Sequence, residues 1–226
     1  MSPINIPMPR EQLERVVRQV VRERLAKGGS PGQHPYKPNL VVNISARHMH
    51  VSRQDLATLF GPGAELTVYR WLYQPGEFAS EQTVTVMGPK RRVIDKVRIL
   101  GPVRPASQLE VSITDAIALG IEAPVRPSGS IEGTPGCVVV GPHGVVELKQ
   151  GVIRAERHVH MAPADAALYG FKDRQHVKLR VSSDCTTTFE DVLCRVNPSF
   201  LLEVHLDTDE GNACDLPNAR QVELLA

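Results

Sequence analysis

The stretch RHMHVSRQDLATLFG, residues 47–61, returns in altered form as RHVHMAPADAALYG at residues 157–170. The arginine, both histidines and the aspartate keep one offset of 110 residues, and only the closing glycine slips by one position. Similarity at a fixed long offset indicates a duplication, in which two related halves of a chain present the same group of side chains. The repeat therefore favours two small domains over one large sandwich.

Short runs rich in valine and isoleucine, broken by glycine and proline, fill the chain from residue 39 onward. Their lengths suit β-strands, and their close spacing suits a barrel better than a parallel α/β sheet. Short helices are expected at residues 52–61, 113–120 and 162–170, because each segment has an early aspartate and a glycine where a C-terminal cap belongs. The predicted fold is mainly β with short capping helices, in two β-barrel domains related by the internal repeat.

A different pattern precedes the strands. Within residues 10–27, apolar side chains at helical spacing form one stripe and charged side chains cover the rest. A Gly- and Pro-rich segment follows, which is typical of a flexible linker. The residues alone leave open whether this helix is a tethered recognition element or packs on its own protein. The expected divisions are a helix at 1–27, a linker at 28–38, a first β-barrel from 39–47 with 156–226, and a second β-barrel from 48–155.

Composition excludes several classes of protein. The 226 residues include 26 basic and 25 acidic ones, mixed along the chain, and only 4% aromatic residues. This argues against a nucleic-acid-binding protein, which would have a basic stripe and stacking aromatics. No stretch approaches the roughly 20 apolar residues that cross a bilayer, and no secretory signal is apparent. The four cysteines lack C-x-x-C spacing, so reduced, mostly buried thiols are expected.

The two H-x-H pairs, His48 with His50 and His158 with His160, predict metal binding. Residues i and i+2 of a strand point to the same face, so two imidazoles can converge on one ion. Neutral imidazole is a good zinc ligand, but a pair leaves zinc under-coordinated. Further ligands are therefore expected elsewhere in the chain.

Several residues are candidates for these further ligands. His205, on a strand-like segment, is the best third histidine. Glu110 is a carboxylate directly before a predicted helix, although such a residue is more often exposed on its strand. Cys214 is an alternative without a paired cysteine. Asp55 and Asp165 lie at helix starts, where capping is the better interpretation.

Two loops carry candidate anion-binding residues. Arg104 lies between two prolines in GPVRP, residues 101–105, and its guanidinium offers a planar fork of donors for phosphate or carboxylate. A solvated loop arginine remains the alternative. Arg126 and Ser128 lie in a second small-residue loop that could line a phosphate or nucleotide pocket, or simply connect two elements.

A family resemblance rests on the two R-H-x-H segments, on the block from GPVRP to LEVSITDAIALGI at residues 101–121, and on the closing HLDTDEGNA at residues 205–213. Together they resemble the phosphate propanoyltransferases of propanediol-utilising microcompartments, the PduL-type phosphotransacylases. The resemblance covers residues 39–218, with several motifs in the same order and spacing. It implies a zinc-dependent acyltransferase with two β-barrels and two zinc ions between them.

The resemblance also implies roles for individual residues. One zinc ion would be held with a position open for the coenzyme A sulfur, and its ligands would be His48, His50 and Glu110. The second would be held by His158, His160 and His205. Arg104 would bind phosphate, and Ser128 and Asn212 are weaker assignments as residues lining the pocket for the substrates.

The implied reaction interconverts acyl-CoA, above all propanoyl-CoA, and phosphate with acyl phosphate and CoA, by direct transfer in a ternary complex. Family members often carry a tethered amphipathic helix that directs them into a protein shell. Residues 1–27 are therefore expected to contact shell proteins and to place a homo-oligomer, most simply a dimer, in the lumen of a bacterial microcompartment. The alternatives are a zinc-dependent hydrolase and a non-catalytic metal-binding scaffold protein. A cupin-type dioxygenase is disfavoured, because the glutamate expected shortly after each H-x-H pair is missing.

Overall fold

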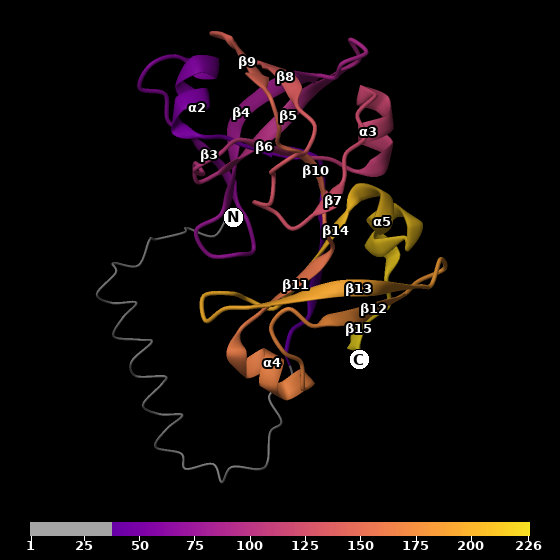
Figure 1. Ribbon diagram of the computed structural model, residues 1–226. Helices are drawn as coiled ribbons and strands as arrows, with labels where there is room; N and C mark the ends of the chain where they lie inside the picture. The colour runs from indigo at the N-terminus through magenta and orange to yellow at the C-terminus, as the bar shows by residue number, and fades with distance from the viewer. Residues whose placement is uncertain (1–37) are drawn as a thin grey trace, which may run out of the picture. The chain divides into compact units, whose positions relative to one another are not determined.

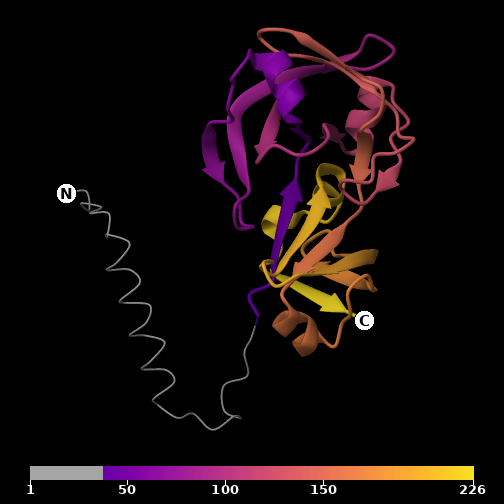
Figure 2. The same cartoon turned by 60° about the vertical axis from the view of Figure 1, so that its left-hand side comes forward.

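Strands dominate the part of the chain that the structure, a computed structural model, describes, which is residues 38–226. They form two sheets, and each sheet curls as an incomplete barrel (Figure 1 and Figure 2). The prediction of a mainly β fold with short helices is confirmed. The predicted helix at residues 1–27 and all but the last residue of the predicted linker lie outside the described residues.

The first sheet has six strands. In spatial order they are β1 (Val41–Ser45), β14 (Glu203–Asp207), β11 (His158–Met161), β13 (Thr187–Val196), β12 (His176–Ser182) and β15 (Gln221–Leu225). β14 lies between β1, which is parallel to it, and β11, which is antiparallel. All six strands come from residues 39–47 and 156–226, the segments predicted for the first barrel.

The second sheet has nine strands. Eight of them follow the order β7 (Val125–Arg126), β10 (Val152–Ala155), β6 (Gln108–Glu110), β2 (His48–His50), β5 (Val93–Gly101), β4 (Phe78–Met87), β8 (Cys137–Val140) and β9 (Val145–Leu148), and β3 (Val68–Trp71) also pairs with β4. All nine lie within residues 48–155. The boundaries of the two domains themselves stay a prediction.

The short helices within residues 38–226 are α2 (Arg53–Phe60), α3 (Ile113–Leu119), α4 (Pro163–Tyr169) and α5 (Thr208–Ala213), with a 3-10 turn at Leu216–Asn218. The first three confirm the predicted helices, whereas α5 was not predicted. Acidic residues stand in the first turn of each helix. Asp55 accepts a hydrogen bond from Ser52 Oγ at 2.8 Å, and Asp165 accepts one from the backbone N–H of Ala162 at 3.2 Å. Both aspartates therefore belong to helix caps, as the sequence suggested.

Each sheet contributes to a separate hydrophobic core. Met49 and Ile99 belong to the core of the nine-stranded sheet, and Leu179 and Val204 to that of the six-stranded sheet. All four cysteines are free thiols and three of them are buried, which confirms the expectation from their spacing. Within residues 38–226, no helix is long and apolar enough to pass through a membrane.

The chain passes between the sheets at two points, and an H-x-H pair directly follows each of them. β1 ends at Ser45 in the six-stranded sheet, and β2 begins at His48 in the nine-stranded sheet. β10 then ends at Ala155 in the nine-stranded sheet, and β11 begins at His158 in the six-stranded sheet. The duplicated pairs are therefore brought to the junction between the sheets by the path of the chain.

Candidate metal centres

The first ligand set lies on two adjacent antiparallel strands of the nine-stranded sheet. His48 and His50 lie on β2, and the register places His48 directly opposite Glu110 of β6. The Nε2 atoms of His48 and His50 lie 3.5 and 3.6 Å from the two carboxylate oxygens of Glu110. All three side chains are buried, and one candidate ligand atom from each lies within 4.8 Å of the others.

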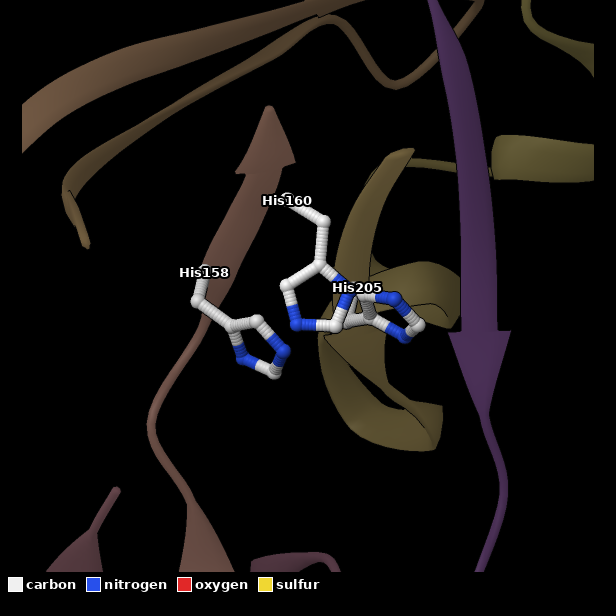
Figure 3. Close-up of side chains that lie close together, drawn as sticks. All are labelled: His158, His160 and His205. Carbon is white, nitrogen blue, oxygen red and sulfur yellow. The ribbon is translucent and has the colours of Figure 1, made fainter. Parts of the chain in front are cut away.

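The second ligand set repeats this arrangement in the six-stranded sheet. His158 and His160 lie on β11, and the register places His158 directly opposite His205 of β14. Figure 3 shows the three imidazoles gathered together, those of His158 and His160 beside β11. Their candidate ligand atoms also lie within 4.8 Å of one another. The structure thus brings the six predicted ligand residues together in two sets of three.

Both sets line one cavity of about 220 Å³. It adjoins a larger cavity of about 550 Å³, and the residues common to both linings are Ser45, His48, Leu72, Glu77, Leu100 and His205. The larger cavity also has three arginines and two aromatic residues in its lining, Arg47, Arg70, Arg98, Trp71 and Tyr73, together with the acidic Glu203. A small chamber that contains the ligand sets therefore adjoins a larger chamber suited to an anionic organic molecule.

Hydrogen bonds set the protonation of the first histidine in each pair. Nδ1 of His48 lies 2.8 Å from the carbonyl oxygen of Ala46, and Nδ1 of His158 lies 2.8 Å from that of Glu156. Because a carbonyl can only accept, each Nδ1 carries a proton and each Nε2 keeps a lone pair. This is the second-sphere arrangement of metal-binding histidines.

The second pair and its partner contain buried ring nitrogens without hydrogen bonds. Within residues 38–226, both ring nitrogens of His160 and Nε2 of His205 are buried and make no aligned hydrogen bond. Nδ1 of His205 lies 3.2 Å from the hydroxyl oxygen of Ser45. Buried polar atoms usually have partners, so such atoms call for a bound group. Neutral imidazole nitrogens and a carboxylate are the donors that zinc takes, and both sets fit a divalent transition metal.

Electrostatic interactions within the first set compensate one another. Burial alone would raise the pKa of the Glu110 carboxyl, but the neighbouring His48 and His50 outweigh it and hold that pKa well below its usual range. Burial alone would lower the pKa of His48, yet Glu110 raises it above the ordinary value. For His50, burial prevails and lowers the pKa to about 4.

In the second set, burial outweighs the contribution of the Glu110 carboxylate, which raises the pKa of His158. Burial, followed by the positive charge of His205, lowers the pKa of His158 to about 3. Burial, followed by the charge of His158, lowers the pKa of His160 to about 2. These imidazoles are therefore neutral at pH 7, the form that binds a metal ion.

Arg104 and Ser128 lie beside the first set. The Arg104 guanidinium donates from Nη1 to Ser128 Oγ at 3.0 Å, and Ser128 Oγ donates to Glu110 Oε1 at 2.7 Å. Burial lowers the pKa of the Arg104 guanidinium. Gln108, also buried, donates to Glu110 Oε1 at 2.6 Å and to Ser128 Oγ at 3.0 Å. Oε1 of Glu110, the oxygen that faces His50, is thus held by two further donors.

Sequence reasoning missed Arg195, which also lines the cavity. It lies on β13, directly beside His160 in the sheet. The arginine–carboxylate ion pairs within residues 38–226 involve neither Arg104 nor Arg195. Two guanidiniums without carboxylate partners therefore face the same chamber. The apolar run Val192–Cys194 marks the strand in the sequence, but nothing in it signals this role for Arg195.

Three sequence candidates do not join the ligand sets. Asn212 is exposed on α5 and lines neither of the two cavities described above. Cys214 is buried in the core of the six-stranded sheet, where its thiol donates to the carbonyl oxygen of Gly211. Arg126 is exposed and donates to the carbonyl oxygen of Val125.

A second internal repeat explains the third ligand of each set. Positions 110 and 205, 112 and 207, and 115 and 210 are each separated by 95 residues. In both copies the ligand lies at or near the end of a strand. Two residues later, Ser112 or Asp207 caps a short helix, and an acidic residue follows in the first turn of that helix. That acid pairs with the arginine before an H-x-H pair: Arg47 with Asp115 at 2.7 Å, and Arg157 with Glu210 at 2.8 Å. Glu110 and His205 are therefore equivalent positions.

Comparison with known proteins places the chain in a family. The sequence model of phosphate propanoyltransferases matches residues 41–217. A phosphate propanoyltransferase of Planctopirus limnophila is 54% identical over 222 residues, which cover 96% of this chain and 91% of the relative. A phosphate propanoyltransferase of Thermotoga maritima is 53% identical, and the match covers 80% of this chain and 86% of the relative. One from Rhodopseudomonas palustris is 43% identical, and the match covers 93% of this chain and 95% of the relative.

These matches define the chain as an enzyme of the acyltransferase class. It belongs to the phosphate propanoyltransferase family. The resemblance drawn from the two R-H-x-H segments is thereby confirmed.

Proposed function

We propose that this enzyme interconverts acyl-CoA and phosphate with acyl phosphate and CoA, with propanoyl as the preferred acyl group. The observation that carries the proposal is that both ligand sets and two unpaired arginines line one chamber. The names of the relatives supply the substrates, since each is a phosphate propanoyltransferase. The chamber supplies what the reaction needs, a place for an anion beside groups that stabilise developing charge.

The proposed cofactors are two zinc ions per chain. One would be held by His48, His50 and Glu110, and the other by His158, His160 and His205. The support is the donor chemistry of each set, the spacing of the ligand atoms and the buried nitrogens that lack hydrogen bonds. When bound, zinc acts as a Lewis acid that polarises a carbonyl group and stabilises a thiolate.

The side chains of the chamber would orient the reactants. Arg104 and Arg195 can each present two donors to phosphate oxygens, because guanidinium matches the geometry of that anion. A phosphate oxygen then attacks the thioester carbonyl carbon, the carbon–sulfur bond breaks, and CoA leaves as a thiolate. Phe200 stacks on His160, with ring centroids 4.1 Å apart, and helps to exclude water from this chamber. Among residues 38–226, no cysteine lines the chamber, and its two serines, Ser45 and Ser128, are engaged with His205 and Glu110 of the ligand sets, which favours direct transfer over an acyl-enzyme.

The larger cavity is the proposed place for coenzyme A. Arg70 and Arg98 suit the phosphates of the nucleotide end, and Trp71 and Tyr73 offer aromatic surface to the adenine. Because this cavity shares residues with the chamber of the ligand sets, the thioester end can reach them while the nucleotide stays outside.

An assay of acyl-CoA consumption with and without phosphate tests the proposal. Acetyl-, propanoyl- and butanoyl-CoA should each be compared, with free thiol and acyl phosphate measured separately. Acyl phosphate should form in equal amount to the thiol, and only when phosphate is present. Equal thiol release without phosphate would instead identify a zinc-dependent hydrolase, and no turnover of any substrate would favour a metal-binding scaffold protein.

We also propose that residues 1–27 direct the enzyme into the lumen of a bacterial microcompartment through contacts with shell proteins. The support is the apolar stripe and the linker that follows it in the sequence. A chain that begins at residue 34 should keep its rate with acyl-CoA but fail to co-purify with shells. Loss of activity on that truncation would contradict the proposal.

Two further structural features are proposed for the assembled enzyme. The two curled sheets are expected to close as complete β-barrels, since closure removes strand edges. A homodimer is expected, and the exposed side chains of Ile113 and Ile117 on α3 offer an apolar surface for it. Light scattering should give twice the mass of the chain, and a monomer would contradict this expectation.

A further inference from the structure

In each ligand set, a fourth residue lies opposite the second histidine on the neighbouring strand. In the nine-stranded sheet, Gln108 of β6 lies directly opposite His50, just as Glu110 lies opposite His48. In the six-stranded sheet, the residue opposite His160 is Glu203 of β14. Positions 108 and 203 are separated by the same 95 residues as the third ligands. Glu203 is therefore the counterpart of Gln108, the residue that holds the Glu110 carboxylate.

The surroundings of Glu203 hold a carboxylate in place. Its side chain is only 3% exposed. Oε1 accepts a hydrogen bond from Asn43 Nδ2 at 2.6 Å, and Oε2 accepts one from Gln74 Nε2 at 2.6 Å. The third neighbour is Nε2 of His205, 3.2 Å from Oε2. Each oxygen therefore accepts from an amide group, an arrangement that suits an ionised carboxylate.

A buried negative charge is costly unless an opposite charge lies nearby. Within residues 38–226, no lysine or arginine forms an ion pair with Glu203, and its one titratable neighbour at ion-pair distance is His205. Nδ1 of His205 already faces the hydroxyl of Ser45, which leaves Nε2 for a metal ion. A cation bound by Nε2 would therefore lie close to the Glu203 carboxylate and balance its charge.

The two ligand sets also differ in charge, because only the first contains a carboxylate. Glu203 would supply a negative charge beside the second set. The first set includes the carboxylate of Glu110, whereas the second set consists of three histidines. A divalent cation on three imidazoles keeps its whole charge in a buried site, and a carboxylate in its second sphere lowers that cost. Each half would then supply one carboxylate to its ion.

Resting on the two-zinc proposal above, we propose that Glu203 is the second-sphere carboxylate of the three-histidine centre, a residue that lies beside Nε2 of His205 and offsets the charge of the zinc ion bound there. Gln74 extends this role to the other sheet. It lies between β3 and β4, and its amide bonds both the N–H and the carbonyl of Leu201 as well as Glu203. Gln74 thus ties a loop of the nine-stranded sheet to the centre in the six-stranded sheet.

The decisive measurement is zinc affinity in competition with a chromophoric chelator. The wild type should hold two ions. Glu203→Gln keeps the size of the side chain and removes its charge, so one ion should bind about 10- to 100-fold more weakly while the other is unchanged. Glu147→Gln, which changes an exposed carboxylate paired with Lys149, should leave both affinities unchanged and is the matched control.

A double variant identifies which ion responds. His158→Ala removes the three-histidine centre, so adding Glu203→Gln to it should cause no further loss of zinc affinity. A further loss in the double variant, or an unchanged pair of affinities in Glu203→Gln alone, overturns the inference. If the wild type binds no zinc at all, the two-zinc proposal itself fails.

Gln74→Ala covers the case in which Glu203→Gln does not fold. This variant leaves the charge in place and removes one donor to it, so the same ion should be weakened by a smaller factor, about 3- to 10-fold, within the range that loss of an outer-shell partner causes. Circular dichroism should show a folded protein. Unchanged zinc affinity in a folded Gln74→Ala protein contradicts the proposed network.

Discussion

The place that Glu110 takes in the nine-stranded sheet is taken by His205 in the six-stranded sheet. The backbones match: each set has an H-x-H pair that begins a strand and a third ligand on the antiparallel neighbour. The electrostatics differ, because Glu110 raises the pKa of His48, whereas the pKa of His158 falls to about 3. A duplicated backbone thus conserves where ligands lie, while one side chain decides the charge that a centre offers to its ion.

The largest expected effect comes from removing one ligand of either set. His48→Ala and His160→Ala should each lose one of two zinc ions, and activity should fall at least about 1000-fold, equivalent to roughly 4 kcal/mol of transition-state stabilisation. Elemental analysis and rate measurements on the same samples check this. His143→Ala, outside both sets, is the control and should retain two ions and full activity. Equal metal content in all three variants would remove the distinction between ligand and bystander.

Substitution of the arginines should sharpen the comparison without touching zinc. Arg104 lies by the first set and Arg195 by the second, so both should hold phosphate from opposite sides. Arg104→Lys and Arg195→Lys should each lose roughly 2–4 kcal/mol in kcat/KM for phosphate, because lysine lacks the planar fork. The affinity for CoA should change much less. Normal phosphate kinetics in either variant would take that arginine out of the site.

Acid should destabilise the metal-free protein mainly through the second set. The pKa values of His158 and His160 are lowered to about 3 and about 2. Below pH 6.5, these histidines are therefore protonated in the unfolded state but remain neutral in the folded state. The free energy of unfolding should therefore fall below pH 6.5, by about 1.4 kcal/mol per pH unit for each such histidine. In the first set, the lowered pKa of His50 is opposed by the raised pKa of His48.

Urea unfolding of the chelator-treated protein between pH 7.5 and 5 measures this slope. His160→Gln should flatten it, whereas His48→Gln should make it steeper, since a group with a raised pKa stabilises the folded state as pH falls. The same slope in both variants would mean that the two sets respond alike to protons.

The smallest effect is expected at a carboxylate that lies near the first set but belongs to a helix cap. Asp55 accepts hydrogen bonds from Ser52 and Ser107 rather than facing the histidines. Asp55→Ala should cost about 0.5–2 kcal/mol of stability, typical for loss of a cap, and leave both zinc ions bound. Thermal unfolding and elemental analysis test this together. Loss of one zinc ion would place Asp55 among the ligands.

Much of the fold could be predicted because its signals are local. Short runs rich in valine and isoleucine indicated the strands, and an early aspartate with a closing glycine located α2, α3 and α4. The helix α5 was missed because its six residues, TDEGNA, include a glycine and form no apolar face.

The sequence by itself determined that two histidine pairs each face one side of a strand, since residues i and i+2 do so in any register. It also determined the family, through motifs that keep their order along the chain. Only the tertiary structure decided that Arg195 lies beside His160, that Glu203 lies opposite it, and that both ligand sets share one chamber. The physical reason is that strand pairing joins residues far apart in the chain, and a shift of one residue would turn each side chain to the opposite face.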